Sequence, residues 1–244
     1  MNKVIYIGNS LRVAEAIYRL KDVELLAVIY QTGKVSAAEI SQSLIPCEHF
    51  GVDSKCTLTD VCREYYGIVD FAVMYSFGII LPEELTQEME IYNFHPGDLR
   101  DNRGSSPVNW SILLNRRETK MTLHKVGKEI DLGEVISEHS CNIYPHDVPS
   151  TLSARMSGEI PSMVLELISF RQSKQMPSII AHGVYRQRIR EEDYTIHPED
   201  SDEIINAKIR SQYDYGGAIV IKDGLKMKVD SMKAYWNVIG GHSV

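Results

Sequence analysis

Short apolar runs alternate with segments of helical character along the N-terminal part of the chain. The runs fall at residues 4–7, 25–30, 46–50 and 70–75, and the helical segments at residues 10–20 and 36–43 and from about residues 57 and 82. Strands that alternate with helices form βαβ units, which build a parallel sheet. The sequence therefore predicts an α/β fold, a Rossmann-like and mostly parallel sheet with flanking helices.

Beyond these units the same kinds of pattern continue with fewer repeats. We expect a helix at residues 106–114, strands at 120–126 and 134–143, and helical periodicity at 149–175 that Gly158 and Pro161 interrupt. From about Pro177 short strands, turns and an acidic run take over, and residues 216–229 predict a hairpin that turns at Lys222, Asp223 and Gly224. We expect a core domain at residues 1–177 and a small C-terminal subdomain of mixed helix and hairpin at residues 178–244.

Composition excludes several classes of protein. The 244 residues carry a net charge of −7, which argues against an extended nucleic-acid-binding surface. No apolar run approaches the length of a membrane span. The four cysteines form no CxxC pair and no zinc-like spacing with histidine, so we expect free thiols and no metal. These features predict a soluble, cytoplasmic protein that binds neither nucleic acid nor a membrane.

A further strand is predicted at residues 92–95, and polar or glycine-containing segments lie at or just after the ends of three predicted strands, at residues 8–10, 76–78 and 93–95. Open α/β sheets bind ligands beyond the carboxyl ends of their strands, so we expect these segments to line one crevice. The first segment lacks the GxGxxG pattern of nicotinamide-binding domains, and the chain has neither a GxxxxGK[ST] phosphate loop nor a GxSxG elbow. These three motifs therefore do not explain what the crevice binds, and the polar residues in it must be considered for themselves.

Asn93 and His95 stand two residues apart just before Pro96, so their side chains would share one face at a strand end. Asp131 lies in a predicted loop, where an aspartate is most often a turn former, and a lone histidine is most often part of a core. Together the three offer a base, a carboxylate that fixes its tautomer, and an amide donor for an oxyanion. Acyl transfer to a substrate amine fits this set, and the spacing leaves both interpretations open.

Two segments carry a resemblance to a known family. NFHPGDLRDNRGSSPVNWSILLN, followed by MTLHKVGKEIDLGEVI, resembles the formyltransferases that use N10-formyltetrahydrofolate, which include methionyl-tRNA, glycinamide ribonucleotide and sugar N-formyltransferases. The resemblance is strongest from about Tyr75 to Ile143. It implies that residues 1–177 are the catalytic core, with His95 as the base toward the amine, Asn93 binding the formyl oxygen and Asp131 orienting His95.

The resemblance also implies the co-substrate and its contacts. N10-formyltetrahydrofolate would be the formyl donor, without a metal. The residues implied for folate binding are Ser76, Phe77, Gly78, Ile79, Gly104, Ser105, Ser106, Pro107 and Val108. The candidates for binding a nucleotide sugar are Asn9, Ser10, Arg103 and Trp110. For Trp110, a place in the core or an interface competes with nucleotide binding.

The acceptor is the open question, because residues 99–104 read LRDNRG where the family often has Leu-Pro-x-Tyr-Arg-Gly. The tRNA enzymes are expected to carry a longer, basic C-terminal domain, whereas this chain is acidic and the purine enzyme would not need the tail. We therefore expect a dTDP-linked 4-amino-4,6-dideoxyhexose as acceptor, for O-antigen or other lipopolysaccharide synthesis. A tRNA or purine acceptor, or a non-catalytic folate- or nucleotide-sugar-binding protein, remains an alternative. The tail could add to a homodimer interface.

Overall fold

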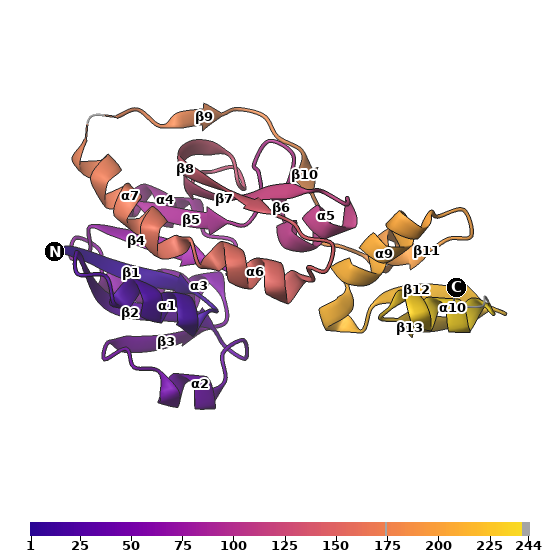
Figure 1. Ribbon diagram of the computed structural model, residues 1–244. Helices are drawn as coiled ribbons and strands as arrows, with labels where there is room; N and C mark the ends of the chain where they lie inside the picture. The colour runs from indigo at the N-terminus through magenta and orange to yellow at the C-terminus, as the bar shows by residue number, and fades with distance from the viewer. Residues whose placement is uncertain (174, 241–244) are drawn as a thin grey trace. The chain divides into compact units, whose positions relative to one another are not determined.

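The computed structural model describes residues 1–173 and 175–240. Its main sheet orders the strands of these residues as β3-β2-β1-β4-β5-β7-β8-β9 (Figure 1). The strands are β1 (Asn2–Gly8), β2 (Val23–Gln31), β3 (Glu48–Val52), β4 (Phe71–Tyr75), β5 (Ile91–His95), β7 (Glu118–Lys125), β8 (Gly133–Asn142) and β9 (Ser178–Ile180). Neighbours from β3 to β5 run parallel, while β7 is antiparallel to β5 and β9 to β8. The predicted α/β fold with a mostly parallel sheet is confirmed.

The helices begin where small polar residues can cap them. Ser10 caps α1 (Leu11–Tyr18) by accepting a hydrogen bond from the backbone N–H of Val13, and Ser36 caps α2 (Ala37–Gln42). Ser54 caps α3 (Lys55–Glu64), which therefore starts earlier than the predicted residue 57. The remaining helices that follow are α4 (Glu83–Glu88), α5 (Pro107–Leu113), α6 (Pro149–Ser157) and α7 (Ile160–Gln172). The break between α6 and α7 contains the predicted Gly158, while Pro161 lies in the first turn of α7, where its missing N–H is tolerated.

Contacts divide the chain into two compact units, each made of separate stretches of sequence. Unit 1 comprises Met1–His95, Met121–His139 and Ser157–His182, and unit 2 comprises Pro96–Lys120, Ser140–Met156 and Gly183–Val244. This division does not test the expected domain boundary near residue 177, which stays a prediction.

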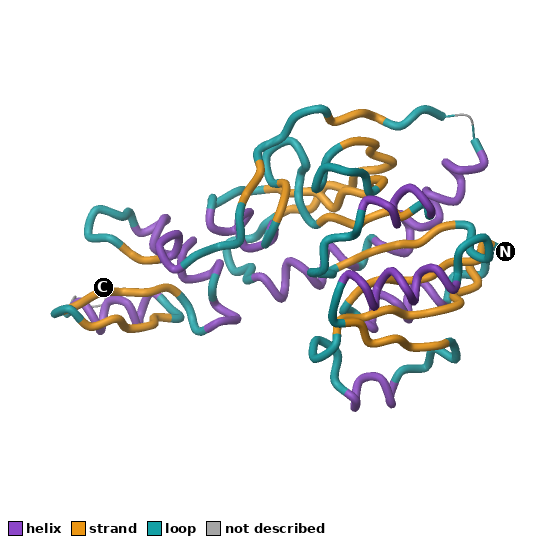
Figure 2. The backbone as a smooth tube through the Cα atoms, turned by 180° about the vertical axis from the view of Figure 1, so that it is seen from behind, coloured by secondary structure: helices purple, strands orange, loops and turns teal. Residues whose placement is uncertain are grey.

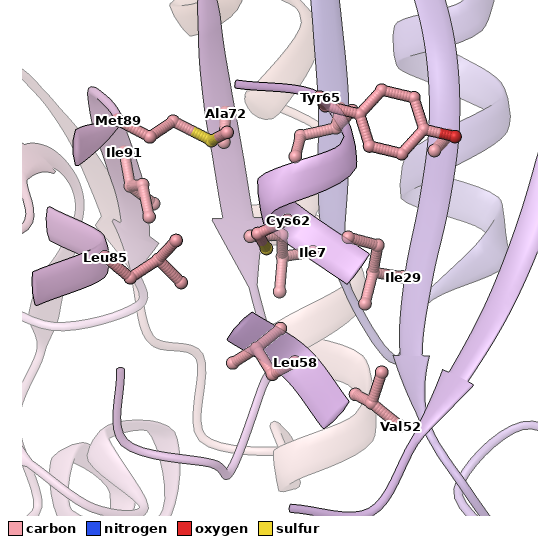
Figure 3. Packing of buried hydrophobic residues seen from close by; sticks show 12 residues of the cluster. Ile7, Ile29, Val52, Leu58, Cys62, Tyr65, Ala72, Leu85, Met89 and Ile91 are labelled. Atoms are coloured by element: carbon pink, nitrogen blue, oxygen red, sulfur yellow. The ribbon is translucent and has the colours of Figure 1, made fainter. Parts of the chain in front are cut away.

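The core of unit 1 lies between the parallel strands and two of their helices. Ile7, Ile29 and Ala72 of the strands pack with Leu58 and Cys62 of α3 and with neighbouring apolar residues, as Figure 3 shows. Parallel strands covered by helices bury both faces, so they read as continuous apolar runs. This is why the sequence pattern identified β1, β2 and β4 directly. The tube view in Figure 2 shows these strands side by side.

Unit 2 contains the C-terminal elements and α5. Arg103–Gly104 (β6) pairs with Tyr185–Arg186 (β10), and a second small sheet contains β11 (Thr195–Ile196), β12 (Ala218–Lys222) and β13 (Leu225–Val229). The helices of unit 2 that follow residue 182 are α8 (Glu191–Tyr194), α9 (Asp202–Ser211), a 3-10 turn (Tyr213–Tyr215) and α10 (Met232–Ile239). The predicted hairpin is β12–β13, and Asp223 and Gly224 at its turn both have positive φ, 51° and 76°. The expected C-terminal element of mixed helix and hairpin is confirmed.

The four cysteines are free, as expected, and Cys62 lies fully inside the core. Burial raises the pKa of the Cys62 thiol to about 12 and that of Cys47 to about 11. Thiols with raised pKa form little thiolate and react slowly. Across the described residues, no helix is long and apolar enough to cross a membrane.

Candidate active site

Unit 1 brings Asn93, His95 and Asp131 together. Asn93 and His95 lie at the carboxyl end of β5, and Asp131 lies in the loop between β7 and β8. The Nδ1 atom of His95 is 3.5 Å from Oδ2 of Asp131, and Nδ2 of Asn93 is 3.4 Å from the other carboxylate oxygen. Two of the three residues that the sequence grouped by chemistry, His95 and Asn93, therefore lie beside the carboxylate of the third, Asp131.

The surroundings of His95 suit a base with a fixed proton position. The His95 residue is only 4% exposed. A carboxylate beside Nδ1 favours the tautomer with its proton on that atom, which leaves the lone pair on Nε2. Asp131 adopts a φ of 49°, a left-handed conformation that aspartate tolerates better than most residues. Asp131 thus shapes its turn and faces the imidazole at the same time.

His124 is a fourth member of this cluster, which sequence reasoning missed. Its Nε2 atom is 3.2 Å from Nδ2 of Asn93 and 3.4 Å from Oδ1 of Asp131, and the residue is 2% exposed. Its Nδ1 is 3.2 Å from the carbonyl oxygen of Lys125, which can only accept, so Nδ1 carries a proton. A neutral His124 would then accept from Asn93, and a protonated one would donate to Asp131.

The signal for His124 was present but could not be read from one chain segment. The residue stands inside the family-like segment MTLHKVG. Only the antiparallel register of β5 and β7 places it opposite Asn93. Pairing register depends on both strands and their connection, so a single-strand pattern does not reveal it.

The segment Ser76–Ile79 follows β4 at the carboxyl edge of the parallel sheet in unit 1. Ser76 has a φ of 53°. The side chain of Asn9 donates to the Ser76 carbonyl oxygen at 2.7 Å, and the Gly78 N–H donates to Gln31 Oε1 at 2.7 Å. The structure therefore brings Asn9 together with the segment expected to bind folate.

Ser10 and Asn9 both have structural partners. Ser10 caps α1, and Asn9 uses both its amide oxygen and its amide nitrogen in hydrogen bonds within unit 1. Their assignment to a nucleotide sugar stays a prediction, and the described contacts account for both residues without one.

The remaining predicted residues, from Arg103 to Trp110, belong to unit 2. A Cβ atom on Gly104 would lie 2.5 Å from the carbonyl oxygen of Arg186, so only glycine fits where β6 meets β10. Ser106 has a φ of 59° and precedes Pro107, the first residue of α5, while Val108 is buried in the same helix. The segment Gly104–Val108 is thus a close-packed turn entering a helix.

Trp110 and Arg103 connect this segment to the chain that follows residue 182. Trp110 donates its indole N–H to the carbonyl oxygen of Gln187 at 2.9 Å, and the Arg186 guanidinium lies 5.3 Å from its ring centroid. Arg103 donates to the Gly183 carbonyl oxygen at 3.3 Å. These contacts give both residues a role in holding unit 2 together, and their binding of a nucleotide sugar stays a prediction.

Comparison with known proteins identifies relatives of this arrangement. A family model described as "Formyl transferase" matches residues 23–168. The methionyl-tRNA formyltransferase of Desulforamulus reducens is 26% identical over 162 residues, which are 64% of this chain and 51% of that protein. The chain spans about half the length of the curated relatives it matches.

Three solved structures share the fold. A 4-N formyltransferase from Francisella tularensis has a TM-score of 0.75 at 18% identity, covering 94% of this chain and 97% of that one. A sugar N-formyltransferase from a Shewanella species has a TM-score of 0.71 at 18% identity, covering 95% and 97%. HypX from Aquifex aeolicus, in complex with tetrahydrofolic acid, has a TM-score of 0.70 at 16% identity, covering 94% and 37%. Because the family model covers more than half of the residues, the chain belongs to the formyl transferase family.

Proposed function

We propose that the chain transfers the formyl group of N10-formyltetrahydrofolate to the amine of a nucleotide-linked amino sugar. The observation that carries this proposal is the cluster in unit 1, where the carboxylate of Asp131 lies within 3.5 Å of His95 Nδ1 and 3.4 Å of Asn93 Nδ2. It supplies a base, a partner that stabilises the protonated base and an amide donor, without a protein nucleophile.

The proposed reaction forms a bond between the substrate nitrogen and the formyl carbon. His95 Nε2 takes the proton that the attacking amine loses, and Asp131 stabilises the resulting imidazolium. An amide N–H of Asn93 donates to the formyl oxygen as it gains negative charge. The bond from the formyl carbon to N10 of the donor then breaks, and N10 leaves with a proton returned from His95. No metal is needed for this sequence of steps.

Family membership supports the choice of donor, as does the fold shared with a HypX structure that contains tetrahydrofolic acid. We assign the pteridine to the segment Ser76–Ile79 of unit 1, and the folate contact expected from Gly104–Val108 of unit 2 stays a separate prediction. Each segment includes a glycine and a non-glycine residue with positive φ, namely Gly78 and Ser76 in the first and Gly104 and Ser106 in the second.

The acceptor is proposed from the fold and from charge. A solved sugar N-formyltransferase aligns with this chain over 97% of its own length at a TM-score of 0.71, and a solved methionyl-tRNA formyltransferase over 91% at 0.66, so the structural likeness is somewhat greater to the sugar enzyme. The net charge of −7 also disfavours a long phosphate backbone. The finer assignment is a dTDP-linked 4-amino-4,6-dideoxyhexose used for O-antigen synthesis. Methionyl-tRNA is the second candidate acceptor, because the curated sequence relatives are methionyl-tRNA formyltransferases.

Two further features complete the proposal. The hairpin β12–β13 exposes Ile221 and Leu225, at 54% and 68%, and we propose it as part of a homodimer interface.

The four free cysteines fit a reducing compartment, so we place the enzyme in the cytoplasm.

The experiment is a mass-spectrometric assay with N10-formyltetrahydrofolate and a panel of nucleotide-linked amino sugars. We expect a product heavier by about 28 Da, and a roughly 10²–10⁴-fold lower turnover in His95→Asn with little change in nucleotide-sugar affinity. His182→Asn, at an exposed histidine of the same unit, is the control.

The outcomes separate the alternatives. Unchanged turnover in His95→Asn contradicts the role of base. Formylation of methionyl-tRNA but of no sugar would identify the second candidate, methionyl-tRNA, as the acceptor. Binding of folate without formylation of any amine supports a non-catalytic binding protein.

A further inference from the structure

Two side-chain amides, those of Asn9 and Gln31, interlock at the carboxyl ends of β1 and β2. Asn9 Oδ1 accepts from the backbone N–H of Gln31 at 2.9 Å. Asn9 Nδ2 donates to Gln31 Oε1 at 2.9 Å and to the carbonyl oxygen of Ser76 at 2.7 Å. Gln31 Oε1 accepts a second bond, from the backbone N–H of Gly78, at 2.7 Å. Asn9 and Gln31 therefore hold the segment that follows β4 by two hydrogen bonds, one to the Ser76 carbonyl oxygen and one from the Gly78 N–H.

Backbone partners determine which way each amide points. A backbone N–H only donates, so the atom of Gln31 that faces Gly78 is its oxygen, and the atom of Asn9 that faces Gln31 N is also its oxygen. The nitrogen of Asn9 is then left for the Ser76 carbonyl oxygen, which only accepts. The pair has one consistent arrangement of donors and acceptors.

The turn Ser76–Gly78 has a backbone conformation that surrounding contacts must stabilise. Ser76 adopts a φ of 53°, in the left-handed region that costs a non-glycine residue free energy and persists only when its surroundings hold it. Gly78 lies so close to Gln31 that an added Cβ would be 3.0 Å from Oε1. A side chain at position 78 would therefore require the end of the Gln31 side chain to shift by a few tenths of an ångström.

We propose that Gln31, together with Asn9, is a positioning residue for the formyl donor: it holds the turn Ser76–Gly78 in the shape that presents main-chain groups to the pteridine. The inference rests on the proposed function, in which this turn binds the donor. It gives a role to Gln31, which the sequence did not single out. It also moves Asn9 from the acceptor side of the reaction to the donor side.

A matched pair of variants separates this role from simple packing. Gln31→Glu keeps an oxygen that accepts from Gly78 and Asn9, whereas Gln31→Leu keeps the size of the side chain and removes the acceptor. We expect Gln31→Leu to raise the KM for N10-formyltetrahydrofolate about 5- to 50-fold, the effect of losing two hydrogen bonds, with kcat and the KM for the acceptor within about twofold. Gln31→Glu should restore most of the donor KM. Gln87→Leu, at an exposed glutamine on α4, is the control.

A second measurement needs no turnover. Amide hydrogen exchange of Gly78 in the ligand-free full chain should be slow in the wild type and in Gln31→Glu, and faster in Gln31→Leu. Titration with tetrahydrofolate should show weaker binding only in Gln31→Leu. Unchanged Gly78 exchange in Gln31→Leu, or faster exchange with unchanged tetrahydrofolate affinity, overturns the inference.

The same titration distinguishes failure of the two proposals. If the wild type does not bind tetrahydrofolate, the proposed function fails and the positioning role fails with it. If the wild type binds and both Gln31 variants bind equally well, only the positioning role fails. A raised acceptor KM with an unchanged donor KM in Asn9→Asp would return Asn9 to the acceptor side and contradict its part in the inference.

Discussion

The two units hold their candidate residues by different means. In unit 1 the residues stand at the ends of neighbouring strands, so sheet register brings Asn93 opposite His124 and Gly8 opposite Tyr75. In unit 2 the segment Arg103–Trp110 is fastened by backbone groups far along the chain, at Gly183 and Gln187. The comparison teaches that residues at the end of one predicted strand, such as Asn93 and His95, can be grouped from the sequence, whereas partners set by strand register or by a distant segment cannot.

The largest expected effect is on catalysis in unit 1. Asp131→Asn removes the carboxylate beside His95 and should lower kcat roughly 10²-fold, because the protonated base loses its partner. Asp131 and Asp223 have nearly the same φ, 49° and 51°, and asparagine tolerates that conformation too. Asp223→Asn is therefore a matched control for the backbone. Equal kcat values in both variants would show that Asp131 serves only its turn.

His124→Gln tests whether the fourth residue contributes to the same cluster. Glutamine can still accept from Asn93, but it lacks the ring that contacts Asn93 through Nε2 and the Lys125 carbonyl oxygen through Nδ1. We expect kcat to fall about tenfold, measured by initial rates, because Asn93 and Asp131 lose a fixed neighbour. A wild-type kcat would mean that His124 does not contribute to the placement of Asn93 and Asp131.

Trp110→Phe tests the contrast in unit 2. The ring is largely kept while the indole N–H that donates to Gln187 is lost, so the free energy of unfolding should fall by about 1 kcal/mol. Chemical denaturation measures this change. If the free energy of unfolding is unchanged and nucleotide-sugar affinity falls, Trp110 belongs to the acceptor site, and its bond to Gln187 does not stabilise unit 2.

The smallest expected effect concerns His139 of unit 1, which lies between two carboxylates. Its Nδ1 is 3.0 Å from Glu159 and its Nε2 is 2.9 Å from Glu166, so both bonds require the imidazolium. Burial lowers the pKa of His139, but the hydrogen bonds to Glu159 and Glu166 outweigh it, and the net pKa is raised. A raised pKa means that this contribution to stability is fully present below the ordinary histidine pKa of about 6.5 and is lost as the pH rises through the folded-state value.

His139→Gln should remove that pH dependence. The glutamates are largely exposed, so solvent screening limits the expected loss of stability to about 0.5 kcal/mol at low pH. The difference in unfolding free energy between wild type and variant should shrink as the pH rises, with His182→Gln as the control. A difference that is constant with pH would contradict the ionic role.

Much of the fold followed from local patterns. The apolar runs of β1, β2 and β4, the serine cap of α1 and the break between α6 and α7 are properties of short segments. The predicted strand at residues 46–50 is β3 at Glu48–Val52, a small shift that pairing with β2 sets. Local signals thus identified the elements, and pairing fixed their ends.

The sequence by itself determined the element types, the mostly parallel sheet and the grouping of Asn93, His95 and Asp131, because periodicity, caps and family-like segments are written along the chain. Tertiary structure decided the parts that depend on two strands or two distant segments. These are the place of His124 opposite Asn93, the fastening of Ser76–Gly78 by Gln31, and the bond from Trp110 to Gln187. Each is a contact between residues far apart in sequence, and only the folded backbone brings such residues within hydrogen-bonding distance.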